Sequence, residues 1–183
     1  MLVNLRVLFG RLIDIALLRG GPETLPASRG LLAFVILLNA VVAVLVVALV
    51  PAVPPFSPLG LFVSTIVPLL WFQVAFALAK KPERFVQTMT ALFGVNVMFQ
   101  PVVTPLFAAL LPYMQKQDPS MPPPVAMSLL FLIITVWLFI VSVRIVRAAF
   151  EWHYVAAIVF VLAQNLAVVL VIAMMVGDPP GKA

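Results

Sequence analysis

Residues 85–111, FVQTMTALFGVNVMFQPVVTPLFAALL, form the stretch around which the rest of the chain is organised. It is apolar and exceeds the roughly 20 residues that a helix needs to cross a bilayer. Gly94, Pro101 and Pro105 interrupt it. Each proline removes a backbone donor and clashes with the carbonyl group four residues earlier. Because lipid cannot satisfy the freed carbonyl groups, the sequence predicts a kinked central helix whose interrupted face turns toward protein or trapped water.

A polar stripe runs along the same stretch. Asn96, Gln100 and Thr104 recur every fourth residue, and side chains at that spacing share one face of a helix. We therefore expect Asn96 and Gln100 to face the helix bundle and to hydrogen-bond there, with Asn39 and Asn165 as the favoured partners.

The composition identifies the class of protein. Hydrophobic residues make up 64% of the 183 residues and charged residues 9%, whereas a soluble domain carries about 25% charged residues. The sequence therefore predicts an integral membrane protein with one small domain. There is no cysteine, which excludes disulfides, thiolate metal sites and cysteine nucleophiles. The first long apolar span starts only near Leu31, so we expect no cleavable signal peptide.

The expected fold is all-α, with five transmembrane helices and an N-terminal interfacial amphipathic helix. Residues 1–28 are expected to form the cytoplasmic amphipathic helix and a turn, residues 29–176 the membrane domain, and residues 177–183 a short external tail. The five spans are expected at about 31–50, 59–79, 85–111, 125–143 and 154–176 from their hydropathy and length. The helix of the fourth span should continue past the membrane toward Glu151.

Residues 2–18 have the pattern of the amphipathic helix. Its expected apolar arc consists of Leu5, Leu8, Phe9, Leu12, Ile15 and Ala16, opposite Arg6, Arg11 and Asp14. A segment of about 17 residues with charges inside it favours the membrane interface over a spanning position. It can pack against the cytoplasmic face of its own protein, contact lipid headgroups, or do both.

Basic residues predict the orientation. Nine of the eleven Lys and Arg residues fall on one side of the expected spans, and only Lys116 and Lys182 fall on the other. The excess of basic residues marks the cytoplasmic side, so the N-terminus should be cytoplasmic and the C-terminus outside, with the net charge of +5 on the cytoplasmic face. A candidate surface for anionic lipid headgroups or a protein partner consists of Arg6, Arg11, Lys80, Lys81, Arg84, Arg144 and Arg147. The same charges can serve to set the topology alone.

Three stretches resemble the Ypt-interacting-protein (Yip) domain family, particularly its bacterial members. They are LLRGGPETLPAS at 17–28, ALFGVNVMFQPVVTPLFAALL at 91–111 and VWLFIVSVRIVRAAFEWHYVAAIVFV at 136–161. The resemblance implies five spans, a cytoplasmic N-terminus and a bacterial plasma (inner) membrane. The acidic–Leu–Tyr–Gly–Pro motif of the eukaryotic branch has no counterpart here, so the resemblance implies no role with small trafficking GTPases.

The sequence predicts no catalytic, cofactor or metal site. His153 is the single histidine, and with Glu151 and Arg147 it forms either a general-base pair or, as we favour, an interfacial turn. No expected span contains a carboxylate, whereas proton relays and ion-coupled pumps usually need one. The carboxylates are too scattered for a metal site, no Gly-rich phosphate loop is present, and no nucleic-acid partner is expected.

A polar layer is expected near the bilayer midplane. Counted from the span ends, it comprises Asn39, Asn96, Thr135, Gln164 and Asn165, with Gln100 one turn outward. These groups can form interhelical hydrogen bonds, which average about 0.6 kcal/mol, or line a small polar cavity. We favour hydrogen bonding, because five helices leave little room for a conduit.

The leading functional hypothesis is a non-enzymatic accessory or scaffold subunit that binds partner membrane proteins and membrane lipids. The alternative is a small-molecule or lipid transporter, active as an oligomer, with the polar layer along its path. A membrane-embedded enzyme is the third class and lacks a nucleophile–base pair.

Overall fold

The computed structural model describes residues 5–50, 58–116 and 123–176, and within these ranges every regular element is helical. Among these described residues, five helices are long and apolar enough to cross a membrane, which confirms the expected all-helical fold with five membrane-length segments. The helices are α1 (Leu5–Ala16), α2 (Arg29–Leu49), α3 (Pro58–Leu78), α4 (Phe85–Lys116), α5 (Val125–Phe150) and α6 (Tyr154–Val176). Two short 3-10 turns, η1 (Pro22–Thr24) and η2 (Pro82–Arg84), precede α2 and α4. The expected external tail, 177–183, lies outside the described residues.

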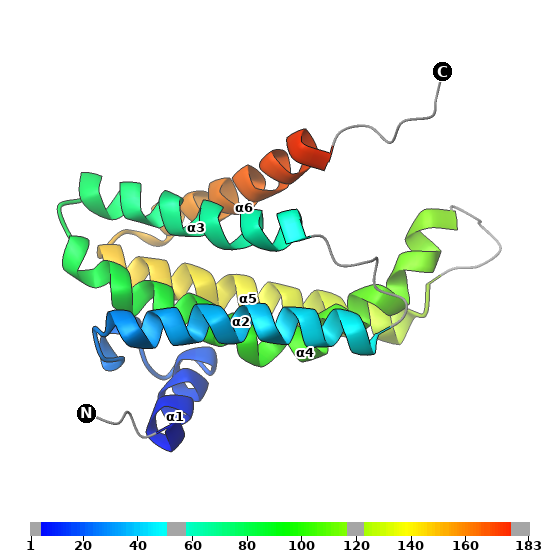
Figure 1. The fold of residues 1–183 in the computed structure, drawn as a ribbon, viewed down its shortest axis with the longest axis horizontal. Coiled ribbons are helices and arrows are strands. Elements are labelled where there is room, and N and C mark those ends of the chain that lie inside the picture. Colours follow the sequence, from blue (N-terminus) through cyan, green and yellow to red (C-terminus); the bar gives the residue numbers. More distant parts are fainter. Residues whose placement is uncertain (1–4, 51–57, 117–122, 177–183) are drawn as a thin grey trace.

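The helices form two layers with α4 at the centre (Figure 1). α2, α4 and α5 lie side by side, while α3 and α6 pair with each other in a second layer. α4 contacts α1, α2, α3 and α5, and its most extensive contact is with α2. The expected third span is therefore the helix on which the others pack.

α4 stays continuous through Pro101, Pro105 and Pro112, although its C-terminal part bends away from the direction of its first half (Figure 1). It also runs on to Lys116, beyond the expected end at residue 111. Prolines can remain inside a membrane helix because neighbouring helices and local adjustments satisfy the freed carbonyl groups.

Gly94 of α4 is a notch for α1. A Cβ atom added to Gly94 would lie 2.6 Å from Cδ2 of Leu12, so any larger residue at this position would force the Leu12 side chain to move. The sequence analysis expected Gly94 to contribute to a helix kink, and the structure shows in addition that Gly94 gives the Leu12 side chain room to pack.

α1 packs on the rest of the chain through one of its faces. Leu8, Leu12, Ile15 and Ala16 are buried, and α1 contacts α4 and α5. The indole Nε1 of Trp137 in α5 donates a hydrogen bond of 2.9 Å to the carbonyl oxygen of Ala16. This bond satisfies one of the carbonyl groups that the end of α1 leaves without a helical partner.

An aromatic cluster joins the two layers. The Phe76 and Phe150 rings stack with their centroids 4.1 Å apart, and Phe72 meets Phe160 edge-on at 5.1 Å. Trp152 stacks on Phe150 at 4.3 Å. Such ring pairs contribute about 0.5–1.5 kcal/mol each beyond their buried area. The cluster therefore holds α3, α5 and α6 together at the end of the molecule where α5 ends.

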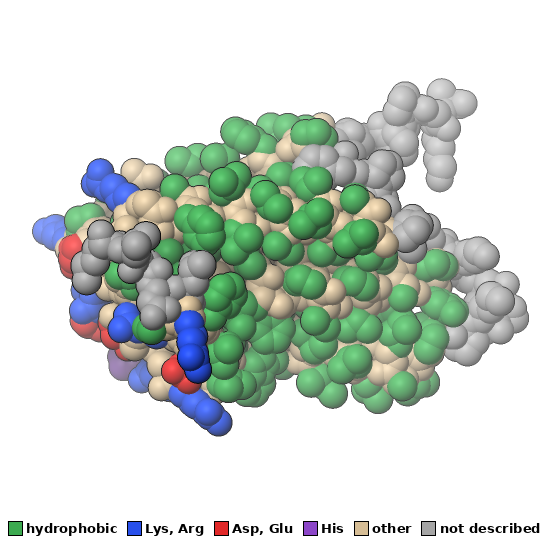
Figure 2. Space-filling model, turned by 60° about the horizontal axis from the view of Figure 1, so that its bottom comes forward, with side chains coloured by type: hydrophobic (Ala, Val, Ile, Leu, Met, Phe, Trp, Pro, Cys, Tyr) green, Lys and Arg blue, Asp and Glu red, His purple; other side chains and the backbone are tan. Residues whose placement is uncertain are grey.

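The same end of the molecule is basic. The Lys and Arg side chains visible in Figure 2 gather there, and the long flanks of the molecule are covered by apolar side chains. The basic end carries the start of α2, the α3–α4 connection and the end of α5. α5 reaches this end as one helix to Phe150, as the sequence predicts for the extension of the fourth span.

The notch at Gly94 gives a first prediction. Gly94→Val should displace Leu12 and lower the free energy of unfolding by about 1–3 kcal/mol, the usual cost of overpacking. The measurement is the thermal midpoint of the purified protein in mild detergent, with Gly10→Val as a control, because nothing lies within 4 Å of a Cβ added at Gly10. Leu12→Ala should partly rescue Gly94→Val. Equal midpoints for the Gly94→Val and Gly10→Val proteins would show that α1 does not dock there.

Candidate functional site

An amide pair links α2 to α4 near the middle of the bundle. Nδ2 of Asn96 donates a hydrogen bond of 2.8 Å to Oδ1 of Asn39, which is the pairing that the sequence analysis expected. Asn39 is only 6% exposed, whereas Asn96 is exposed at the surface of the bundle. A bond of this kind is weak, about 0.6 kcal/mol on average, and mainly fixes the register of the two helices.

The remaining polar residues of the expected layer do not join this pair. Asn165 donates from Nδ2 to the carbonyl oxygen of Val161, and Thr135 donates from Oγ1 to that of Phe131, each at 2.8 Å and within its own helix. The expectation that Asn165 bonds to the α4 stripe is therefore wrong. The reason is the packing order, because α6 packs against α3 and α5 rather than against α2 or α4.

Gln100 lies on the expected stripe but stays unpaired. Its Oε1 atom is buried and has no hydrogen-bond partner among the described residues. Gln164 is half-buried on α6, and its side chain makes no hydrogen bond within the described part of the chain. The structure thus contains one interhelical amide pair, Asn39–Asn96, and no connected polar layer across the described helices.

At the basic end, the α3–α4 connection clamps the end of α5. Nζ of Lys81 lies 2.6 Å from Oε2 of Glu151, and Nη2 of Arg84 lies 2.7 Å from Oε1 of the same carboxylate. Glu151 follows the last residue of α5 in a left-handed conformation, with φ of 62°. One carboxylate thus holds two cations from a connection about 70 residues away in sequence.

The same two cations cap the helix end. Nζ of Lys81 donates to the carbonyl oxygen of Phe150 at 3.2 Å. Nη1 of Arg84 donates to the carbonyl oxygens of Ala149 at 3.1 Å and Ala148 at 3.3 Å. The last carbonyl groups of a helix lack helical partners and carry partial negative charge, so cations stabilise this end of α5.

The clamp shifts the titration of Glu151. The hydrogen bond from Lys81, then the hydrogen bond and charge of Arg84, hold the pKa of this carboxyl below its ordinary value of 4.5. Because its side chain is 60% exposed, solvent screens much of this interaction.

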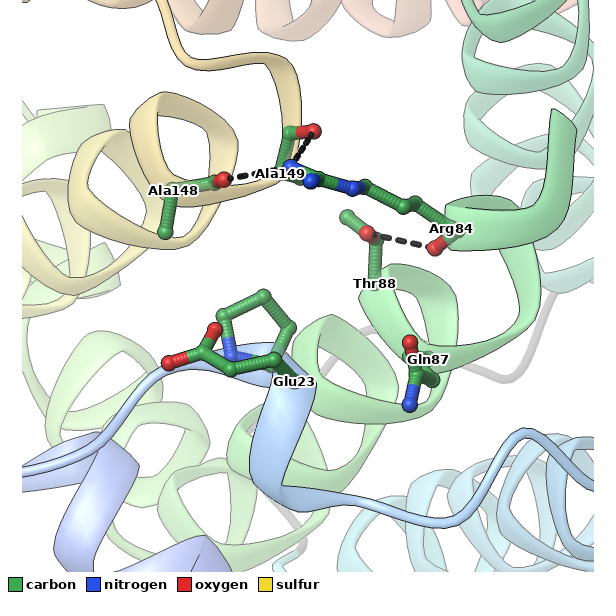
Figure 3. A pocket seen from close by; sticks show the side chains of 7 residues that line it. Glu23, Arg84, Gln87, Thr88, Ala148 and Ala149 are labelled. Carbon is green, nitrogen blue, oxygen red and sulfur yellow. Dashed lines mark hydrogen bonds between the residues drawn. The ribbon is translucent and has the colours of Figure 1, made fainter. Parts of the chain in front are cut away.

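A cavity of about 330 Å³ lies beside the clamp, between η1, α4 and α5 (Figure 3). Figure 3 shows Arg84 turned toward the carbonyl groups of Ala148 and Ala149 rather than toward Glu23. Gln87 donates from Nε2 to the carbonyl oxygen of Leu25 at 2.7 Å, and Thr88 donates to that of Arg84 at 2.8 Å. Arg84, Gln87 and Thr88 thus use their side chains for hydrogen bonds to backbone carbonyl groups of the protein rather than presenting them to a ligand.

The other basic residues of the expected surface have varied surroundings. The guanidinium of Arg147 lies 4.2 Å from the ring centroid of Tyr154, and Arg11 donates to the carbonyl oxygen of Thr24. Arg6 lies exposed on α1. Lys80 and Arg144 are exposed, and their side chains make no ion pair or hydrogen bond with other described residues. Of the seven basic residues, only these last two offer wholly unengaged charges.

The residues weighed as a general-base pair are not brought together. His153 is exposed, and both carboxylate oxygens of Glu151 face Lys81 and Arg84 instead. In the part of the chain that the structure describes, no three His, Asp or Glu side chains are grouped so that they could hold a metal ion.

Comparisons of the chain with protein-family models, with curated proteins and with solved structures find no significant match. The candidate sites therefore rest on the geometry alone.

Sequence reasoning missed the two hydrogen bonds that attach the N-terminal segment, from Trp137 to Ala16 and from Gln87 to Leu25. The available signal was weak. Trp137 lies among apolar residues of the fourth span, and Gln87 lies near the start of the third span. Their positions in the sequence do not show which carbonyl group each side chain reaches.

The clamp gives a second prediction. A carboxylate with a lowered pKa contributes stability above its ordinary pKa and loses it as the pH falls through the lowered value. Glu151→Gln should therefore lower the thermal midpoint by a constant amount from pH 7 to about pH 5, and the difference should shrink as the pH falls below 4.5. The measurement is a thermal melt in detergent at each pH.

Glu83→Gln is the matched control, because Glu83 is exposed and makes no ion pair with any described residue. It should leave the midpoint nearly unchanged across the same pH range. If Glu151→Gln behaves like this control at pH 7, the clamp does not stabilise the end of α5.

Proposed function

We propose that this protein is a non-enzymatic scaffold or accessory subunit of a membrane, which binds partner membrane proteins through the flanks of its helices and lipid through its basic end. The observation that carries the proposal is the exposed amide of Asn96. Its Nδ2 atom bonds to Asn39, but its Oδ1 atom has no hydrogen-bond partner among the described residues. Lipid tails offer no partner at this depth, whereas a polar side chain on another membrane helix does.

A scaffold accounts for the polar residues better than a transporter does. The Asn39–Asn96 pair lies between α2 and α4, while Asn165 and Thr135 bond within their own helices. These groups therefore do not line one common path within a single copy. The spans also contain no carboxylate for ion coupling. An oligomer that places several copies of Asn96 and Gln100 around a ligand is the arrangement that a transporter would need.

The proposal includes an orientation and a location. The basic end faces the cytoplasm, in keeping with the excess of basic residues on the cytoplasmic side of membrane proteins, and the membrane is the plasma membrane of a bacterium. Membership of the Yip domain family belongs to the same proposal. It rests on the three stretches quoted from the sequence and is compatible with five membrane-length helices.

We further propose that α1 lies in the plane of the membrane interface. One face packs on α4 and α5 through Leu8, Leu12, Ile15 and Ala16. A second face presents Phe9 and Ile13, followed by Leu17 just after the helix, and the three side chains are 43–46% exposed and spaced four residues apart. Arg11 and Asp14 lie on a third face. A helix with apolar faces toward protein and acyl chains, and a charged face toward headgroups, suits the interface.

A photo-crosslinking residue at position 96 tests the scaffold function. In cells, it should give a discrete adduct between this chain and another membrane protein, because Asn96 is proposed to face a partner helix. Position 162 on α6 is the control, since Leu162 is 54% exposed and is proposed to face lipid tails. It should give lipid adducts.

Lipid adducts alone at position 96 would contradict the scaffold proposal. An adduct between copies of this chain, together with a small molecule that co-purifies with the oligomer, would favour the transporter.

A further inference from the structure

A second cavity opens at the basic end between α2, α3 and the start of α4. Its volume is about 450 Å³. It remains open because α2 and α3 make few contacts with each other. The residues that decide its chemistry are Arg29, Leu32, Gln73, Phe76, Phe85 and Val86.

The cavity is apolar within and polar at its edges. Phe76 is 1% exposed and Leu32 8%, while Phe85 and Val86 are half-buried. Arg29 and Gln73 are exposed, and neither side chain makes a hydrogen bond or an ion pair with other described residues. An unengaged cation thus lies beside an apolar wall.

The position of the cavity along the helices places its polar edge near the lipid headgroups and its apolar wall near the acyl chains. Arg29 is the first residue of α2, and η2 and the first turn of α4 form the opposite rim. Gln73 lies five residues before the end of α3 at Leu78, which corresponds to about 7 Å along the helix axis. The cavity therefore extends from the headgroup level of the proposed cytoplasmic face into the outer part of the hydrocarbon.

The local charge favours an anion. Lys81 and Arg84 are both held by Glu151, but Arg29 and Lys80 are exposed without a counter-charge among the described side chains. Among the described residues that line the cavity, Arg29 is the one that carries a charge, so the rim is positive.

We propose that this cavity binds one phospholipid with an anionic headgroup from the cytoplasmic leaflet, an inference that rests on the lipid-binding part of the proposed function. The guanidinium of Arg29 pairs with the phosphate, as arginine does in bidentate phosphate recognition. One acyl chain lies against Leu32, Phe76, Phe85 and Val86, and the Gln73 amide donates to an ester carbonyl of the glycerol backbone.

A lipid fits this site better than a soluble anion does. A free phosphate would bond Arg29 but leave the apolar wall exposed, whereas an acyl chain covers that wall and keeps water from it. The polar edge and the apolar interior thus match the two ends of one amphipathic molecule.

The test is native mass spectrometry of the intact protein, purified in mild detergent and titrated with dioleoyl phosphatidylglycerol or dioleoyl phosphatidylcholine. The wild type should retain one phosphatidylglycerol in preference to phosphatidylcholine. Arg29→Gln should weaken this retention about fivefold, the effect of roughly one basic residue beside an anionic lipid. Val86→Trp should also weaken the retention of phosphatidylglycerol, because the larger side chain fills the apolar part of the cavity without removing a charge.

Arg144→Gln is the matched control, since Arg144 is an exposed cation on α5 away from the cavity, and it should retain the lipid as the wild type does. Thermal midpoints check that each variant is folded. Equal losses in Arg29→Gln and Arg144→Gln, equal retention of the two lipids, or displacement of the lipid by glycerol phosphate would overturn the proposal. The photo-crosslinking at position 96 tests the binding of a partner protein independently of lipid. The lipid-site proposal and the scaffold proposal can therefore fail separately.

Discussion

Hydrocarbon offers no hydrogen-bond partner to a polar group, and α4 (Phe85–Lys116) is the helix on which this constraint acts most strongly. It carries three prolines within the helix and, near its middle, the amide side chains of Asn96 and Gln100. The structure meets the constraint in part by surrounding α4 with α1, α2, α3 and α5, while Oε1 of Gln100 stays buried without a hydrogen-bond partner among the described residues. Asn39 of α2 accepts the hydrogen bond from Asn96. At Gly94, the absence of a side chain lets Leu12 of α1 pack directly against α4.

The basic end follows from a second requirement, that the end of α5 needs partners for its last carbonyl groups. Lys81 and Arg84 supply them and pair with Glu151 as well. These charges therefore join the α3–α4 connection to α5, in addition to any effect on orientation. The side chains of Arg29 and Lys80, in contrast, make no bond with described residues. Lys81 and Arg84 therefore stabilise the fold, while Arg29 and Lys80 are available to a lipid headgroup.

Hydropathy and length predict the five membrane-length helices because each span must bridge the same thickness of hydrocarbon. The Asn39–Asn96 pair was predictable in part, since both residues fall near mid-span and the four-residue stripe gives α4 one polar face. The failure at Asn165 shows the limit. Helical periodicity says which side chains share a face, but not that α6 packs against α3 and α5. Likewise, the positions of Lys81 and Arg84 indicated a charged side of the membrane, while their bonds to α5 depend on a fold that brings positions about 70 residues apart together.

The central claim is that α2 and α4 lie in the register that the Asn39–Asn96 hydrogen bond defines. The chain contains no cysteine, so crosslinking of introduced cysteines in native membranes with a short bifunctional thiol reagent tests this register directly. Asn39→Cys combined with Asn96→Cys should be joined within one chain by the reagent, because the amide groups of the two native side chains meet at 2.8 Å. Asn39→Cys combined with Asn165→Cys should not. A crosslink between positions 39 and 165, with none between 39 and 96, would contradict the account.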